Sequence, residues 1–149
     1  MPISEIENSK VVKCLSPVSA TSTATFTGTA VDTWGYSDIT IIVHVGISLT
    51  ALSGSNYWTI TFEECAVTTA GSFTHCADTD LEGGVHTVIL DDPTEDDQFI
   101  VRKYKGKLRY VRVLGTITGT LASGTPVDAI VLLSNPINGP IAQTALVQA

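Results

Sequence analysis

Apolar and polar residues alternate with a period of two along most of the chain, which is the pattern of β-strands. The segment Ile39–Ile47 has one fully apolar face and a second face that is also largely apolar. The first face holds Ile39, Ile41, Val43, Val45 and Ile47, and the second holds Thr40, Ile42, His44 and Gly46. This pattern predicts a central strand, or a strand whose outer face is covered by a neighbouring subunit.

A second segment, Tyr57–Cys65, alternates more strictly and predicts a half-buried strand. Its first face holds Trp58, Ile60 and Phe62, and its second holds Tyr57, Thr59, Thr61 and Glu63. Further strands are expected over residues 23–33, 84–90, 97–104, 108–119 and 127–134, with turn-forming residues between them. The 21 threonines favour the same assignment, because β-branched side chains fit strands better than helices.

Seven or eight short strands with almost no helical periodicity predict an all-β fold. We expect an antiparallel β-sandwich or jelly-roll-like domain over residues 19–134. The ends of the chain alternate weakly, so residues 1–18 and 135–149 are expected to form extended N- and C-terminal arms that become ordered when a partner holds them.

The composition indicates that part of the surface is covered by protein. Hydrophobic residues make up 44% of the chain and charged residues 15%, against about 25% in an ordinary domain. Yet no stretch approaches the roughly 18 apolar residues of a membrane helix, and the acidic opening "MPISEIENSKVVK" predicts no secretory signal. The net charge of −7 argues against general nucleic-acid binding.

The positive charge is concentrated in one place, since Arg102–Arg112 holds six of the eight basic residues. Alternation in this stretch divides the charge between two strand faces, which does not suit a phosphate track. The pattern instead predicts a β-hairpin with Lys105-Gly106-Lys107 at its tip, available to dock on an acidic protein surface such as the loop 91–97 of a neighbouring copy. The expected partner-binding residues are Lys10, Lys13, Lys103, Lys105, Lys107, Asp96, Asp97, Ile141 and Leu146.

Catalytic and metal-binding signals are weak. There is no G-x-S-x-G motif, and the three histidines are isolated in the sequence. Cys65, His75 and Cys76 offer three zinc ligands, but adjacent residues of a strand point to opposite faces, which favours cysteines that are simply buried. The acidic run 91–97 could gather calcium, but it lacks the spacing of an EF-hand loop, and a solvated turn around Pro93 is the favoured interpretation. We therefore expect no enzyme activity, no cofactor and no small-molecule substrate.

Three stretches together resemble a family of small virion proteins of tailed phages. They are "GTAVDTWGYSDITIIVHVG", "YWTITFEEC" and "YKGKLRYVRVLGTITGT" followed by "GTPVDAIVLLSNP". The resemblance extends from Thr23 to Pro136 in a consistent order. It departs at Glu63-Glu64-Cys65, where the family has Gln and Ser, and at the acidic loop.

The resemblance implies a structural role, that of a capsid decoration (cement) protein. Such a protein would be made in the host cytoplasm and would bind the major capsid protein on the outer surface of the head, as a homotrimer. A tail, fibre-base or connector component with the same fold is the alternative. A carbohydrate-binding module is a third reading, with Trp34, Tyr36, Tyr57 and Trp58 as its sugar platform.

Overall fold

The computed structural model of the protein describes residues 8–48, 51–69 and 71–138. Their regular structure consists of nine β-strands and one short 3-10 helix, η1 (Asp78–Asp80). The strands are β1 (Ser9–Thr27), β2 (Val31–Asp32), β3 (Tyr36–Val45), β4 (Tyr57–Cys65), β5 (Thr74–His75), β6 (Leu81–Glu82), β7 (Thr87–Leu90), β8 (Gln98–Tyr104) and β9 (Tyr110–Pro136). Every described pairing is antiparallel, so the predicted all-β, sandwich-like fold is confirmed. No helix in these ranges has the length and apolarity needed to cross a membrane.

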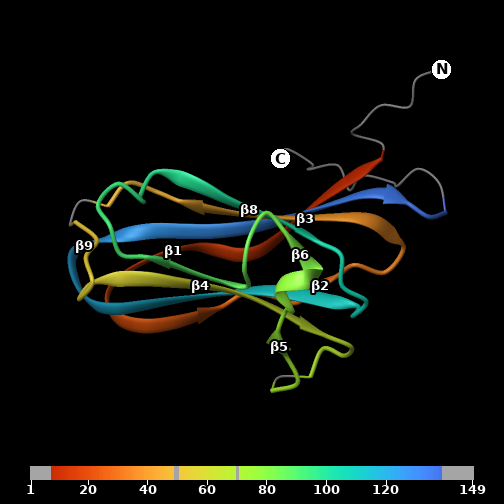
Figure 1. Cartoon of the computed structure of the whole chain (residues 1–149), viewed down its shortest axis with the longest axis horizontal. Helices are drawn as coiled ribbons and strands as arrows, with labels where there is room; N and C mark the ends of the chain where they lie inside the picture. Colours follow the sequence, from red (N-terminus) through yellow and green to blue (C-terminus); the bar gives the residue numbers. More distant parts are fainter. Residues whose placement is uncertain (1–7, 49–50, 70, 139–149) are drawn as a thin grey trace, which may run out of the picture.

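The two longest strands, β1 and β9, lie side by side and form a ribbon that bends back on itself (Figure 1). Its register runs from Ser9 opposite Ser134 to Thr27 opposite Leu114. Before the bend, residues 110–118 of β9 pair with β4, and after it residues 127–136 pair with β3. The ribbon therefore belongs to two layers. The β4 layer also contains β2, β5 and β7, and the β3 layer also contains β6 and β8.

The core lies between these layers. The backbone N–H of Val113, in the β4 layer, donates to the Sγ atom of Cys14, in the β3 layer, at 3.3 Å. The inward positions of β3, from Ile39 to Val45, are buried as the alternation predicts, whereas Ile47 lies beyond the strand and is exposed. Trp58, Ile60 and Phe62 of β4 are fully buried. The predicted division into two faces is therefore confirmed for β3. In β4 the inward face is confirmed, but Thr61 and Glu63 of the predicted outer face are also buried.

Strand β9 is continuous where the sequence predicts two strands separated by a turn at 122–126. Gly119 and Gly124 have φ values of +87° and +68°, which glycine adopts without strain. These residues let β9 bend without leaving its partner, while β1 follows through a register shift between Ala20 and Ser22. The predicted turn residues thus bend a strand and do not end it.

The N-terminal boundary of the sheet also differs from the prediction. Residues 9–18, which we expect in an arm, belong to β1, because they pair with the last third of β9 and bury Cys14 and Leu15 in the core. At the other end β9 extends to Pro136, which lies inside the predicted C-terminal arm. Ile141 and Leu146 lie outside the described residues.

The bend at Gly119 gives a stability prediction. A Cβ atom at this position would overlap the carbonyl oxygen of Ser55 and the side chain of Asn56, and its φ is positive. We expect Gly119→Ala to lower the free energy of unfolding by about 2 kcal/mol or more, measured by urea denaturation. Gly54→Ala is the control, since an added Cβ there contacts nothing within 4 Å and its φ is not positive. Equal midpoints for the two variants would contradict this account of the bend.

Candidate functional site

The basic stretch Arg102–Arg112 does not form a hairpin. Strand β8 ends at Tyr104 and pairs with β3 and β6, whereas β9 begins at Tyr110 and pairs with β2 and β4. Residues 105–109, the basic connector, therefore cross from one layer to the other. The hairpin prediction is wrong because a glycine turn signal marks a change of direction but does not determine which strands pair.

The connector is fixed to the core by the buried residue Tyr104. The Tyr104 hydroxyl donates to the carboxylate of Glu64 on β4, and the backbone N–H of Leu108 donates to the same hydroxyl at 3.1 Å. A Cβ at Gly106 would overlap the Tyr104 ring, so the connector passes this ring at a glycine. Burial and the neighbouring Glu64 carboxylate raise the pKa of Tyr104 well above its usual range. The two layers and the connector are thus joined at one tyrosine.

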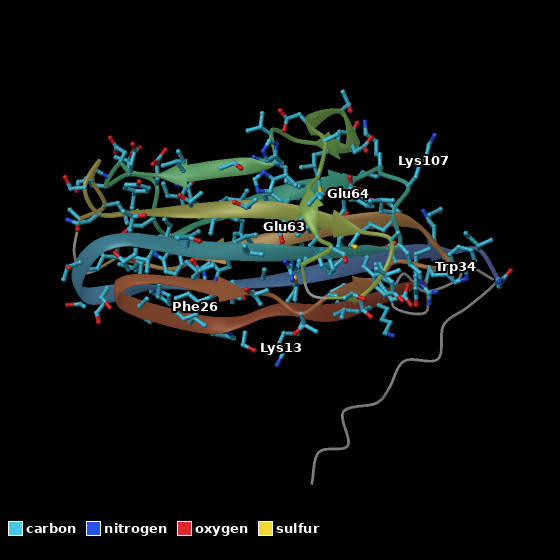
Figure 2. The ribbon with its side chains drawn as sticks, turned by 90° about the horizontal axis from the view of Figure 1, so that it is seen from below. Lys13, Phe26, Trp34, Glu63, Glu64 and Lys107 are labelled. Atoms are coloured by element: carbon cyan, nitrogen blue, oxygen red, sulfur yellow. The ribbon has the colours of Figure 1, made fainter. Side chains whose placement is uncertain are left out.

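Most cations of the basic stretch have acidic partners within the chain. Four ion pairs account for them: Lys103–Asp38 at 3.0 Å, Lys105–Glu82 at 3.7 Å, Arg109–Asp32 at 2.6 Å and Arg112–Glu63 at 2.7 Å. Lys107 is exposed and has no acidic partner among the described residues. The remaining two cations are Arg102, which donates to the backbone carbonyl oxygens of Val85 and Val101, and the exposed Lys107 (Figure 2). The stretch is therefore largely neutralised, and Lys107 is its exposed cation outside the described ion pairs.

An exposed aromatic residue lies beside the connector. Trp34 is 76% exposed, in a turn whose backbone is held by a hydrogen bond from the Trp34 N–H to Asp32 Oδ1 at 3.0 Å. The Arg109 guanidinium lies 5.7 Å from the Trp34 ring centre and 5.1 Å from that of Tyr110, and it donates twice to the Asp32 carboxylate. The Arg109 hydrogen bond holds the pKa of Asp32 below its usual range. We call Trp34, Arg109 and Tyr110 the tip cluster.

In the sequence analysis Trp34 is assigned only to a possible sugar-binding platform with Tyr36, Tyr57 and Trp58. The structure does not bring these four side chains together. Trp58 is fully buried in the core. Tyr57 lies at the start of β4 opposite Thr118, whereas Trp34 follows β2, which pairs near Tyr110 at the far end of β4. The signal for an exposed Trp34 is the Asp-Thr-Trp-Gly turn, since Asp and Gly are turn residues and turns lie on the surface.

The acidic loop 91–97 lies at the opposite end of β8 from the connector. Its carboxylates mainly hold its own turn and the neighbouring loop. Glu95 accepts the N–H groups of Asp91 and Asp92, and Asp96 accepts the N–H of Ser48 at 2.7 Å. Among the described residues, no group of three His, Cys, Asp or Glu side chains has the arrangement of a metal site. Because the loop and the connector are far apart in one chain, contact between them requires two copies.

The other expected contact residues occupy different surfaces. Lys10 and Lys13 are exposed on β1, and Lys13 points away from the sandwich (Figure 2). Lys103 is on the outer side of β8, and Asp97 has a positive φ of 52° at the start of that strand. Lys105 and Lys107 therefore lie on the connector with Arg109, and Figure 2 shows Lys107 at a different edge of the domain from Trp34. Lys13 and Asp96 lie on other elements.

The cysteines and histidines do not converge on one site. All three cysteines are free and buried, as expected for small apolar side chains. His44 pairs with Asp128 at 3.0 Å, and His86 pairs with Asp78 at 2.6 Å and lies 4.9 Å from the His75 ring. A pocket of about 320 Å³ is lined by Asn8, Ser9, Leu132, Ser134 and Asn135, which are hydroxyl, amide and apolar side chains.

Comparison with known proteins shows the fold alone. No protein-family model and no curated protein matches the chain. The crystal structure of the PBSX exported protein XepA aligns with a TM-score of 0.53 and 14% identity, over 99% of this chain. The chain spans 45% of the length of XepA. A structure of the infectious bursal disease virus Gt strain aligns over 89% of this chain and 38% of that chain, with a TM-score of 0.25 and 10% identity.

The buried thiols predict a loss of stability at high pH. Burial raises the pKa of Cys14 to about 11 and that of Cys76 to about 12, from 9.0. The folded state therefore keeps these protons above pH 9 while the unfolded chain releases them. Each thiol removes about 1.4 kcal/mol of stability per pH unit from pH 9 until its folded pKa is reached. Urea denaturation at several pH values should show this slope, and Cys76→Ala should reduce it. Constant stability from pH 9 to 11 would contradict the prediction.

The Tyr104–Glu64 contact predicts a second effect on stability. Tyr104→Phe removes the hydroxyl and leaves the buried Glu64 carboxylate without this donor, so we expect about 1–3 kcal/mol lower free energy of unfolding. Adding Glu64→Gln should recover part of the loss, because a neutral amide is easier to bury. Tyr110→Phe is the control. If thermal and urea unfolding of Tyr104→Phe match the wild type, the hydroxyl does not hold the two layers together.

Proposed function

We propose that the protein is a structural virion component of a phage, a decoration protein that binds the outer surface of the assembled head. The observation that carries this proposal is the tip cluster. Tryptophan, tyrosine and arginine are the residue types that most often dominate the energy of protein–protein interfaces. Here one of each is gathered at one end of the domain, with Trp34 largely in solvent.

The tip cluster is held in place before any partner binds. Asp32 fixes the Arg109 guanidinium through two hydrogen bonds, and Thr33 donates through both its N–H and its hydroxyl to the Arg109 carbonyl oxygen. A surface held in this way loses little side-chain entropy on binding. Lys107, which lies on the connector two residues before Arg109, adds an exposed positive charge that suits an acidic partner.

The expected partner is the major capsid protein, and the end of the domain that carries the tip cluster would lie against the shell. A protein that binds only the assembled shell stabilises it by mass action, and the many equivalent sites on a head make weak single contacts sufficient. The similarity in fold to an exported protein of phage PBSX and the sequence resemblance to phage virion proteins support a phage origin. In this proposal the chain is made in the host cytoplasm and has no catalytic role.

The test is a sedimentation assay with purified full-length protein and heads assembled without it. We expect the wild type to be retained on heads, and Trp34→Ala and Lys107→Glu each to weaken retention by about 10-fold or more. Thr25→Ala, on an exposed strand position away from the tip cluster, is the matched control. Absence of wild-type retention on heads would overturn the decoration role. Retention on isolated tails would assign the protein to the tail.

A further inference from the structure

The outer faces of the two layers differ in chemistry. The β4 layer presents threonines from neighbouring strands, and the hydroxyls of Thr25 and Thr116 are 3.1 Å apart. This threonine face comprises Thr25, Thr27, Thr59, Thr116 and Thr118, with Leu114 and Ile89 among them. Hydroxyl groups exposed in this way are well solvated, so the threonine face does not require a partner.

The outer side of the β3 layer carries a group of apolar side chains. Its register places Ile42 of β3 between Ile130 of β9 and Val101 of β8, and it places Val11 of β1 beside Leu132 of β9. Phe99 of β8 stacks on His44 at 4.9 Å and is 65% exposed. We call Val11, Ile42, Phe99, Val101, Ile130 and Leu132 the apolar face. This is the second apolar side of Ile39–Ile47 that the sequence indicates.

The apolar face has the size of an interface. It crosses four strands about 4.8 Å apart, and β3 has ten residues of about 3.3 Å each, so the layer presents on the order of 600 Å². A stable interface buries about 800 Å² on each partner, which the face and its polar rim together approach. The six residues of the apolar face lie within this surface among polar and charged side chains, and an exposed apolar patch with a polar rim is typical of an interaction site.

The charges around the face suit a second copy of the same chain. Lys13 and the Lys103–Asp38 pair border it, together with Asp128, which pairs with His44. These are two cations and two anions, so the border is neutral although the chain carries −7. Two copies of a face with a neutral border do not repel each other. A face that binds a strongly acidic or strongly basic partner would instead have a border of the opposite charge.

The charges at the two ends of β8 favour one relative orientation of the two copies. The acidic loop 91–97 precedes β8, and the connector with Lys105 and Lys107 follows it. When two copies stack with their strands antiparallel, the acidic loop of each lies toward the basic connector of the other. A parallel stack would place like charges together.

We propose that the apolar face pairs with the apolar face of a second copy about a two-fold axis, with the strands of the two β3 layers antiparallel. Sheets stack face to face about 10 Å apart, so the contact forms a continuous second core. In a two-fold interface each contact between two different residues occurs twice, so one substitution changes the interface at two places. The pairing does not use the tip cluster, which remains free to bind a virion.

The test compares two apolar residues of similar exposure on opposite faces. Val101, on the apolar face, is 47% exposed, and Ile89, on the threonine face, is 51% exposed. We expect the wild type and Ile89→Glu to sediment at twice 15.7 kDa. We expect Val101→Glu to sediment at 15.7 kDa, because its affinity for a second copy is about 100-fold weaker. Circular dichroism and urea midpoints confirm that each variant is folded, and Val11→Glu at the other edge of the face is a second variant should Val101→Glu unfold.

Three results would overturn the pairing. A wild-type mass of one chain at high micromolar concentration would show that the face does not bind a second copy, and loss of head retention by Val101→Glu would then assign it to a virion partner. A mass of three chains would exclude a two-fold assembly and favour the trimer implied by the family resemblance. Equal dissociation of Val101→Glu and Ile89→Glu would place the contact elsewhere.

Discussion

Strand β1 has one partner among the described residues, β9, and both layers of the sandwich are built outward from the ladder between them. The ladder begins at Ser9–Ser134 in the β3 layer and ends at Thr27–Leu114 in the β4 layer. Because the same two strands enter both layers, the bend in the ribbon determines how the layers face each other. The core between Trp58 and Val131 exists only when that bend is made, and glycines at positive φ allow it.

The sequence predicts the inward-facing residues well and their partners poorly. Alternation identifies the inward side of β3 and β4, because successive side chains of a strand point to opposite faces whatever the neighbouring strand is. It does not reveal that the far end of β4 is buried on both faces. It does not reveal that β1 starts at Ser9, since the serines, threonines and lysines of that strand lie at an edge where polar side chains reach solvent. The sequence also predicts a turn at 122–126, because a glycine that bends a strand cannot be distinguished by sequence from a glycine that ends one.

For the basic stretch, too, the sequence does not reveal which residues are brought together by the fold. Counting residues from Arg102 to Arg112 indicates a strong positive patch, yet Asp32, Asp38, Glu63 and Glu82 lie far away in sequence and are brought beside it by the fold. Exposed ion pairs contribute little stability, about 0–1 kcal/mol each, but they remove most of the patch's attraction for an outside partner. The site that remains is therefore more aromatic than cationic, and Trp34 is central to it.

The structure shows where the apolar residues that are not part of the core lie. One outer face is covered by threonine hydroxyls, so the apolar residues beyond the core are not spread evenly over the surface. Several of them lie on the outer side of the β3 layer. There Ile42 and Ile130 occupy solvent-facing strand positions, at which polar residues are usual. In the isolated domain such a residue is stabilised only by its cross-strand neighbours, since it stays partly in water. The proposed pairing would bury it further, and the apolar face and the tip cluster are the two separate surfaces that we propose for assembly.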